Sequence, residues 1–539
     1  MKGLTSDYQL TLPAILKRAE DLFGHKEIVT RLPDKSFHRY TYEDFARRSK
    51  KLSVALGELG LEKGDRVATL GWNTYQHLEC YFGLPSAGFV IHTLNPRLSP
   101  EDLSYIIEHA GDRALMVDET LLPVLDSVRD RISLDKVFVF SYGDSVPEGL
   151  ESYEDLLERG DESLFEYPDL DENDAAALCY TSGTTGRPKG ALYSHRGLCL
   201  HSMALATADG FCVGEADTML PVVPMFHVNA WGMPFVATMV GAKQVFPGPH
   251  LDPESLLQDF EQESVTFTAG VPTIFLGVLQ TLDAEPGAYD LSKLRTLGVG
   301  GSAAPESMIR GFQERHGLIV LHAWGMTETS PVATISHLTS GLQDASEDEK
   351  YRYRAKQGLA LPFIEVRARS EDGFIPWNGE SMGELEIRGA WVSESYYNTS
   401  EGDDKFTSDG WFRTGDVVSI DPLGYVEIRD RDKDLVKSGG EWISSVDLEN
   451  ALMGHPAVAE AAVIAVPDPR WQERPLGVAV LKEGESATQE ELIEHLAGSG
   501  FAKWQLPDNI EFVDEIPRTA TGKFLKMKLR DQFQDYTPA

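Results

Sequence analysis

The 539-residue sequence predicts a mixed α/β protein with a large N-terminal domain and a smaller α+β C-terminal domain. The chain is too long for one compact core. Its first part alternates short apolar runs with amphipathic stretches, which is typical of packed α/β units. From Gly383 short strands and turns dominate, and a smaller unit begins after the charged run 430–434. We expect a large domain over 1–432, with α/β subdomains and a β-rich subdomain, and a small domain over 433–539.

The N-terminal elements are predicted from the period of their apolar residues. Stretches 66–72 and 113–119, "RVATLGW" and "RALMVDE", have the short apolar runs of strands. Stretch 41–60 is amphipathic and ends at a glycine, which is typical of a helix. The start is no secretory signal. It predicts a helix, because apolar residues recur at helical spacing between charges at Leu12, Ile15, Leu16, Ala19 and Leu22.

A glycine-rich loop, "YTSGTTGRPKG" at 180–190, is expected between two strands. Residues 175–180 predict the first strand, 191–195 the second and 196–209 a helix. Its N–H groups and hydroxyls can converge on phosphate oxygens, yet a Walker loop runs from strand into helix. A flexible surface turn is the alternative. The candidate phosphate-binding residues are Thr181, Ser182, Gly183, Thr184, Thr185 and the positively charged Lys189.

The C-terminal part is predicted to change from strands to a small α+β unit. Ser444 and Asp447 have the spacing of a capping box for a helix that follows them. By spacing, Lys526, Lys528 and Arg530 are expected on the exposed face of a terminal helix. The other stretches are strands at 383–389, 410–420, 424–430, 460–466 and 477–482 and a helix near Glu490.

Composition and charge exclude several classes of partner. The net charge of −36 argues against binding to nucleic acids or anionic membranes, because proteins that bind them present basic surfaces. An anionic substrate must therefore meet local positive groups. No apolar run approaches the ~18 residues needed to cross a bilayer. The four cysteines form no C-x-x-C pair, so neither zinc nor disulfides are indicated. We expect a soluble cytoplasmic protein.

Five further motifs follow the glycine-rich loop in order. They are "GGSAAP" (300–305), "HAWGMTETSP" (322–331), "GWFRTGD" (410–416), "RDRDKDLVKSGGEWIS" (429–444) and "PRTATGK" (517–523). With the loop, they resemble the adenylate-forming superfamily of acyl-CoA synthetases, nonribosomal-peptide adenylation domains and firefly-type luciferases. The resemblance spans nearly the whole chain. It implies an enzyme that breaks ATP between the α- and β-phosphates, with the loop gripping the departing pyrophosphate.

The resemblance implies roles at the ATP site residue by residue. Glu328, a hard oxygen ligand, suits Mg²⁺ on ATP, and Thr327 offers a hydroxyl to phosphate. Asp416 is expected to accept both ribose hydroxyls, with Arg431 beside it. Trp324, where the family more often carries Tyr, is expected to stack on adenine. Each residue also has a structural alternative. Glu328 could cap a helix, Trp324 could belong to the core, residues 300–305 could form a plain tight turn, and Asp416 and Arg431 could be surface charges. The other residues implied at ATP or AMP are Gly301, which also borders the substrate carboxylate, Ser302, Ala303, Gly325 and Met326.

Lys523 in "TATGK" is implied as the catalytic lysine. Attack of a carboxylate on the α-phosphorus builds negative charge, and a positioned ammonium stabilises this charge more in the transition state than in the ground state. Thiolysis requires this lysine to leave. Family members achieve this by rotating the small, mobile domain about a hinge that corresponds to Lys433, although an ordinary linker lysine is the alternative. The resemblance places CoA at Lys437, Ser438, Gly439, Gly440 and Trp471.

The stretch "MFHVNAWGMPF" (225–235) is predicted to line the acyl pocket. Amino-acid adenylation domains place a carboxylate here, whereas this chain has His227, and no carrier domain follows Lys523. Trp231 resembles the tryptophan that lines or gates the channel of fatty acyl-CoA synthetases; a core tryptophan is the alternative. The stretch has no carboxylate or permanent cation and therefore suits an uncharged tail. Its other expected wall residues are Met225, Phe226, Val228, Met233 and Phe235.

The sequence therefore predicts an AMP-forming acyl-CoA synthetase that uses ATP, Mg²⁺ and CoA to activate a short- to medium-chain carboxylic acid. It is similar to bacterial fatty acyl-CoA synthetases and to 3-methylmercaptopropionate-CoA ligases, and a thioether suits an aromatic wall. The alternatives are a long-chain fatty acyl-CoA synthetase, a luciferase-like oxygenase with the same ATP motifs, and a noncatalytic acyl-binding protein. The last should lack Lys523 and Glu328. A homodimer is expected from related synthetases.

Overall fold

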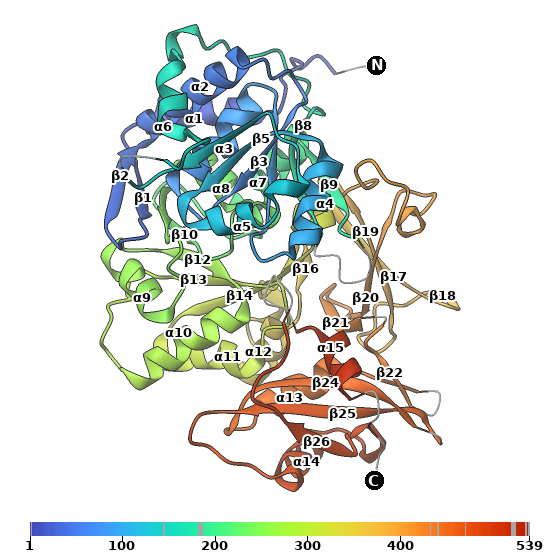
Figure 1. The fold of residues 1–539 in the computed structure, drawn as a ribbon. Coiled ribbons are helices and arrows are strands. Elements are labelled where there is room, and N and C mark those ends of the chain that lie inside the picture. The colour runs from blue at the N-terminus through green and yellow to red at the C-terminus, as the bar shows by residue number, and fades with distance from the viewer. Residues whose placement is uncertain are drawn as a thin grey trace.

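The computed structural model describes residues 1, 3–143, 146–181, 187–431, 433–438, 441–468, 470–518, 524–533 and 536. Across these residues, four β-sheets and their helices form a large N-terminal body and a smaller C-terminal one (Figure 1). The mixed α/β class predicted from the sequence is confirmed.

Two mostly parallel sheets build the α/β part of the large body. The first has the order β7-β6-β5-β3-β4-β8-β9 and the second the order β16-β15-β14-β13-β12-β10-β11-β1-β2. Strands of the first sheet are β3 (Arg66–Leu70), β4 (Val90–Thr93), β5 (Asp112–Asp118), β6 (Lys136–Phe140), β7 (Glu151–Ser152), β8 (Ala175–Tyr180) and β9 (Gly190–Ser194). Strands of the second are β1 (Glu27–Arg31), β2 (Phe37–Thr41), β10 (Thr218–Pro221), β11 (Lys243–Phe246), β12 (Phe267–Gly270), β13 (Thr296–Val299), β14 (Ile319–Gly325), β15 (Val332–Ile335) and β16 (Leu359–Ala360).

Helices cover and join these two sheets. Helix α3 contacts β3 and β4 of the first sheet and β1 of the second, and nearly all of its side chains are buried. A helix in this position joins the two sheets in one core, because both present apolar faces to it. The helices of this body are α1 (Leu12–Phe23), α2 (Tyr42–Glu58), α3 (Tyr75–Ser86), α4 (Pro100–Ala110), α5 (Leu122–Asp126), α6 (Tyr153–Arg159), α7 (His195–Ala206), α8 (Met233–Val240), α9 (Pro253–Gln262), α10 (Pro272–Ala284), α11 (Glu306–Arg310) and α12 (Glu347–Ala355).

The β-rich part is a five-stranded antiparallel sheet in the order β18-β17-β19-β20-β21. In Figure 1 it lies to the right of the α/β sheets and above the small body. The strands expected from Gly383 onward are confirmed here. Their bounds are β17 (Ile364–Ser370), β18 (Gly373–Phe374), β19 (Gly383–Gly389), β20 (Phe412–Ile420) and β21 (Val426–Arg431).

The small body is built on a sheet in the order β23-β22-β25-β24, with β26 beside β25. Its helices lie against this sheet, and its own apolar core includes Leu448, Val463 and Leu492. Its elements are β22 (Val436–Ser438), β23 (Glu441–Ile443), α13 (Ser445–Met453), β24 (Val458–Asp468), β25 (Gln472–Leu481), α14 (Gln489–Gly498), β26 (Asn509–Phe512) and α15 (Lys526–Gln532).

Local sequence patterns explain most elements, with two corrections. The opening helix α1 buries Leu12, Ile15, Leu16 and Ala19, but Leu22 is 54% exposed because the helix ends at the next residue. Ser444 caps α13 by accepting from the N–H of Asp447. The capping box is incomplete, because the carboxylate of Asp447 lies 3.6 Å from Nη1 of Arg429. Among the described residues, no helix is both long and apolar enough to cross a membrane.

Candidate active site

A cavity of about 540 Å³ lies where strands of the nine-stranded sheet end. Its walls include the segments that follow β10, β12, β13 and β14, which are parallel neighbours. Ligands of open α/β sheets bind at this carboxyl edge of the strands. Parts of β20, β21 and the small-domain residues 524–527 complete the walls. This central cavity therefore lies where the large and small domains meet.

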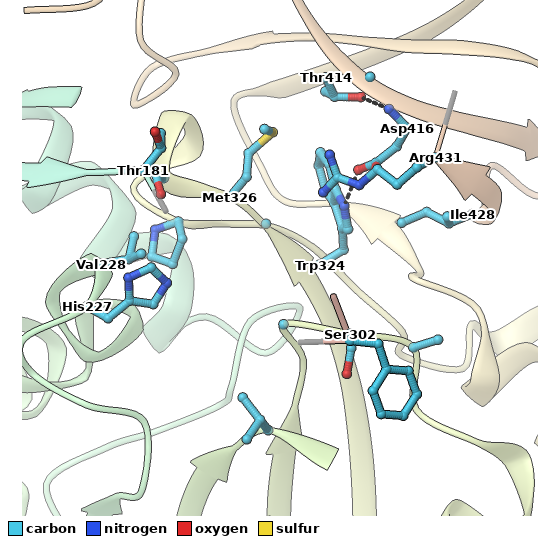
Figure 2. Close-up of a pocket in the computed structure, with 18 of the residues that line it drawn as sticks. Thr181, His227, Val228, Ser302, Trp324, Met326, Thr414, Asp416, Ile428 and Arg431 are labelled. Carbon is cyan, nitrogen blue, oxygen red and sulfur yellow. Dashed lines mark hydrogen bonds and ion pairs between the residues drawn. The ribbon is translucent and has the colours of Figure 1, made fainter. Parts of the chain in front are cut away.

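One wall of the central cavity joins Trp324, Asp416 and Arg431 (Figure 2). Asp416 and Arg431 lie opposite each other on the antiparallel strands β20 and β21. The Nε atom of Arg431 lies 2.6 Å from Oδ1 of Asp416, and the indole N–H of Trp324 donates to Oδ2 at 3.0 Å. Asp416 is only 1% exposed. Each carboxylate oxygen has a second lone pair, so Asp416 can still accept ligand hydroxyls.

Across the cavity, Trp231 packs against the glycines that follow β13. A Cβ atom on Gly300 would lie 3.1 Å from Cη2 of the indole and 2.5 Å from the carbonyl oxygen of Ala323. Only glycine permits this close approach of backbone and ring. The structure also places Gly301, Ser302 and Ala303 on the cavity wall.

A left-handed turn carries Trp231. Residues Val228, Asn229, Ala230 and Trp231 have φ between 46° and 57°, and Gly232 follows at 77°. For residues with a Cβ atom this conformation costs about 1–2 kcal/mol each. Such strain persists where the surroundings hold it, and it concentrates at binding sites. Gly232 is required because a Cβ atom there would lie 2.7 Å from the ring of His201.

The loop after β14 supplies a buried carboxylate, Glu328, which is 4% exposed. The hydroxyl of Tyr396 donates to its Oε1 at 2.5 Å, and the hydroxyl of Tyr193 donates to the carbonyl oxygen of Thr327 at 2.6 Å. Among the described residues, no group of three or more potential ligands is arranged for a metal ion. Mg²⁺ commonly takes one or two carboxylates together with substrate phosphates. Glu328 on the cavity wall fits that arrangement. Gly325, Met326 and Thr327 line the cavity beside it.

The two ends of the glycine-rich loop are tied together. The N–H of Thr181 donates to the carbonyl oxygen of Lys189 at 2.9 Å, and the N–H of Lys189 donates to Oγ1 of Thr181 at 3.0 Å. Strands β8 and β9 are antiparallel, so the prediction that the loop joins two strands is confirmed. The ammonium of Lys189 lies 2.9 Å from Glu401. Thr181 and Lys189 line the cavity, whereas Ser182, Gly183, Thr184 and Thr185 lie outside the described residues.

Positive side chains gather at the cavity despite the strongly acidic sequence. Among its described lining residues, cations outnumber carboxylates. Arg97, which is not among the predicted site residues, also lines the cavity, and its guanidinium lies 5.7 Å from the ring centre of Phe226. No carboxylate in the described part of the chain pairs with it. It follows β4 and meets Phe226 only in the folded chain, so no local pattern indicates it.

The acyl wall differs from the one predicted. Phe226, His227, Val228 and Trp231 line the cavity. Met225, Met233 and Phe235 do not, because they point into the core between the sheets, where each is at most 1% exposed. The wall also contains a permanent cation, since Arg97 reaches it from a distant segment.

The small domain approaches the cavity through the segment before its last helix. Phe524 and Leu525 line the cavity. Lys433, the predicted hinge, lies at the same cavity with much of its side chain exposed. Partial loss of hydration at the cavity and, to a smaller extent, neighbouring cations lower its pKa. Lys523 lies outside the described residues.

The predicted exposure of Lys526 and Arg530 is wrong. The side chain of Lys526 is 11% exposed; its ammonium donates to Oγ of Ser445 at 2.6 Å and lies 2.6 Å from Oε1 of Glu449. Arg530 pairs with Asp434. Helix α15 faces α13 and Asp434, next to the predicted hinge, which the period of a short charged helix does not indicate. Lys528 is exposed, as predicted.

Of the predicted CoA-binding residues, Lys437, Ser438 and Trp471 are described by the structure, and these three do not line the central cavity. Lys437 is exposed, whereas Ser438 is 6% exposed and its hydroxyl accepts from Nη1 of Arg474 at 3.3 Å. Trp471 is 42% exposed, next to Gln472, which pairs with Ser438 across the sheet. These residues therefore gather at one edge of the small domain. Gly439 and Gly440 lie outside the described residues.

Two family models match the chain. The model of the AMP-binding enzyme matches residues 16–397, and that of the AMP-binding enzyme C-terminal domain matches residues 447–523. A long-chain-fatty-acid–CoA ligase of Thermus thermophilus is 51% identical over 98% of this chain and 97% of its own length. A 3-methylmercaptopropionyl-CoA ligase of Ruegeria lacuscaerulensis is 46% identical over 99% of both chains. A medium-chain-fatty-acid–CoA ligase of Ectopseudomonas oleovorans is 43% identical over 99% of this chain and 98% of its own length.

Solved structures share the whole fold. The anthranilate CoA ligase AuaEII in complex with anthranoyl-AMP has a TM-score of 0.87 at 25% identity and covers 99% of both chains. ATP-bound MatB from Rhodopseudomonas palustris has a TM-score of 0.82 at 27% identity, over 98% of this chain and 99% of its own. The architecture, the central cavity and both matched models agree: the chain belongs to the AMP-binding enzyme family.

Proposed function

We propose that this AMP-binding enzyme is an acyl-CoA ligase that converts a carboxylic acid, ATP and CoA into an acyl-CoA thioester, AMP and pyrophosphate. The observation that carries the proposal is one cavity with two kinds of wall. Asp416, Arg431 and Glu328 offer groups for a nucleotide, and Trp231, Phe226 and Val228 offer an apolar surface. Relatives over nearly the full length are CoA ligases of fatty acids and of 3-methylmercaptopropionate.

In the first half-reaction, a carboxylate oxygen of the acid bonds to the α-phosphorus. The bond from that phosphorus to the bridging oxygen breaks, and its electron pair leaves with pyrophosphate. Asp416 would bind the ribose, and Trp324 would contact the adenine. Thr181 and Lys189 lie at the two ends of the glycine-rich loop, which would bind the pyrophosphate. Lys523 would stabilise the charge of the transition state.

Mg²⁺, when bound at Glu328, would neutralise phosphate charge and orient the leaving pyrophosphate. The chain's own contribution is to hold that carboxylate in place. Tyr396 donates to its Oε1. The loop behind it is fixed by Tyr193.

In the second half-reaction, the CoA sulfur attacks the acyl carbon, the thiol proton is lost to water, and AMP leaves with the electron pair of the carbon–oxygen bond. We propose that the small domain, over 433–539, rotates about Lys433 between the two steps. Lys437, Ser438 and Trp471, now on one edge of that domain, would then face the pantetheine arm. Arg97, without a carboxylate partner in the described chain, is available to an anion at the cavity.

We propose an acid with a short or medium uncharged tail, 3-methylmercaptopropionate among the candidates. The indole of Trp231 lies across the acyl wall and is held by a strained turn. A fixed indole shortens the pocket, whereas one that swings aside admits long chains, as a long-chain ligase would need. The composition supports a cytoplasmic protein, and the similarity to related synthetases supports a homodimer. Light scattering of the purified protein would test the homodimer.

The experiment is a screen of AMP release. Straight-chain acids of several lengths, aryl acids and 3-methylthiopropionate are each offered with ATP, Mg²⁺ and CoA. AMP and a CoA thioester in equal amounts, with the highest kcat/KM for an uncharged short or medium acid, are expected. Preference for long chains would support the alternative fatty acyl-CoA synthetase. Emission of light with oxygen would support a luciferase-like oxygenase, and no turnover of any acid would support a noncatalytic binder.

Asp416→Asn is expected to raise the KM for ATP by roughly 10- to 100-fold, as for loss of hydrogen bonds to a charged group. The amide cannot accept from Trp324, Arg431 and a ribose together. Steady-state kinetics with varied ATP measure the effect. Asp409→Asn is the matched control, because Asp409 pairs with Arg367 away from the cavity. An unchanged KM in Asp416→Asn would show that this carboxylate serves the fold alone.

Trp231→Ala is expected to change the relative kcat/KM of short and long acids by roughly 10-fold or more, since pockets discriminate by the methylenes they admit. The fold should persist, because the indole borders a cavity. Trp411→Ala is the control: Trp411 is 7% exposed and does not line the cavity. It should lower the melting temperature and leave the ranking unchanged. The same outcome for Trp231→Ala would assign Trp231 to the core.

A further inference from the structure

The first turn of α15 carries a buried ammonium at the boundary of the two domains. Lys526 donates to Oγ of Ser445 and pairs with Glu449, both on α13. The backbone N–H of Ser445 donates to Oδ2 of Asp430 at 2.7 Å. Asp430 belongs to β21 of the large domain, on the other side of the proposed hinge at Lys433. Lys526, Ser445 and Asp430 therefore form a continuous polar connection from the small domain to the large one.

Charge reinforces this connection. Burial opposes the charge of Lys526, but Glu449, Asp430 and Asp434 outweigh it, so its pKa is raised and the ammonium persists. Burial raises the pKa of Glu449 to about 7, although the Lys526 ammonium acts in the opposite direction. Asp430 is 1% exposed, and its pKa is also raised by burial. A buried charge is retained only where partners hold it, and removing one partner is costly.

The same lysine follows directly on residues that wall the cavity. Phe524 and Leu525 line it, and each is tied back to the strand-like segment before the "TATGK" motif. The N–H of Leu525 donates to the carbonyl oxygen of Pro517 at 2.7 Å, and Phe524 forms a β-bridge with Arg518. Residues 517–518 and 524–525, on the two sides of Lys523, therefore contact each other. Lys526 follows directly, and its side chain binds Ser445 and Glu449 of α13.

We propose that Lys526 is a positioning residue for the adenylation half-reaction. It holds the start of α15 on α13 and next to Asp430, in the domain arrangement that places Phe524 and Leu525 on the ATP cavity. The inference rests on the proposed function. Rotation about Lys433 separates Asp430 from Ser445 and Lys526, while the pair with Glu449 moves with the small domain. The connection is therefore made in one half-reaction and broken in the other.

Figure 1 shows α15 on the side of the small body that faces the five-stranded sheet, as this role requires. A second side chain of α15 also binds near the proposed hinge. Arg530, one turn after Lys526, pairs with Asp434, the residue next to Lys433. A second crossing bond joins Oγ of Ser444 to the carbonyl oxygen of Arg429. Of these contacts, only that of Lys526 combines a buried charge with the segment at the cavity.

Lys526→Met tests the proposal, with Lys528→Met as the matched control on the exposed face of the same helix. Adenylation is measured as acid-dependent exchange of pyrophosphate into ATP, and thiolysis as thioester formation from supplied acyl-AMP. Lys526→Met is expected to slow adenylation by about 10-fold or more, as for a lost charged hydrogen bond, and to spare thiolysis. Lys528→Met should change neither rate. Lys526→Arg, which keeps the charge, should recover part of the adenylation rate.

Equal loss in both half-reactions, or a lower melting temperature without a selective loss, would overturn the positioning role. If Lys526→Met does not fold, Glu449→Gln provides the second test. It keeps the size of the side chain, weakens the anchor of Lys526 and should again slow adenylation selectively; unchanged adenylation in a folded Glu449→Gln would also count against the proposal. Failure of the proposed function itself is distinguishable, because the unmodified enzyme would then show no acid-dependent exchange.

Discussion

Lys523→Ala is expected to lower the rate of acyl-AMP formation by roughly 10²-fold or more, the effect of losing one preorganised electrostatic group. Attack on the α-phosphorus develops negative charge that no proton neutralises. An ammonium at that point stabilises the transition state more than the ground state, so kcat should fall more than KM rises. Thioester formation from supplied acyl-AMP should be nearly unchanged, because in the proposed mechanism rotation of the small domain carries the lysine away before thiolysis.

The measurement compares the two half-reactions in the same preparation. Pyrophosphate exchange reports adenylation, and thioester formation from acyl-AMP and CoA reports thiolysis. Lys528→Ala removes the same charge from an exposed position of the terminal helix and should leave both rates unchanged. An equal loss of both rates in Lys523→Ala would contradict the role assigned to Lys523.

Lys433→Pro is expected to leave pyrophosphate release largely intact and to abolish most CoA thioester formation. Proline fixes φ near −65° and removes the backbone donor, so it hinders rotation about this residue. Adenylation should need no rotation of the small domain, because its residues 524–525 already line the cavity in this structure. Acyl-AMP should therefore form and remain bound, because the second half-reaction is blocked.

Lys433→Ala is the control for this prediction. It removes the side chain that lies at the cavity but keeps the backbone N–H and the freedom of φ. Normal thioester formation in the alanine variant, together with its loss in the proline variant, assigns the effect to the backbone. If the proline variant completes both steps at normal rates, the hinge lies at another residue.

Sequence patterns predicted the elements that depend on local order. The strands β8 and β9 on the two sides of the glycine-rich loop were predicted from short apolar runs. The glycines and threonines of the loop mark the end of β8 and the start of β9. The pairing of Asp416 with Arg431 was expected only through the resemblance. In the structure it follows from register, because the two residues are opposite each other on adjacent antiparallel strands.

An unusual backbone turn and long-range contacts account for what the sequence did not predict. Met225 and Met233 belong to the apolar stretch at Trp231, but the left-handed turn between them directs them into the core. Arg97 reaches the cavity from another sheet. Lys526 resembles any lysine of a charged terminal helix until Glu449 and Asp430 are brought to it by folding. For Arg97 and Lys526 the partners are far away in sequence, so periodicity carries no information about them.

Exchange of labelled pyrophosphate into ATP, measured without CoA, tests the proposed two-step ligase most directly. A bound acyl-AMP intermediate requires exchange that depends on the acid and on Mg²⁺ and does not depend on CoA. Adding CoA should then release AMP and the thioester in equal amounts. Exchange that needs no acid, exchange that requires CoA, or release of ADP and phosphate in place of AMP and pyrophosphate would contradict the account.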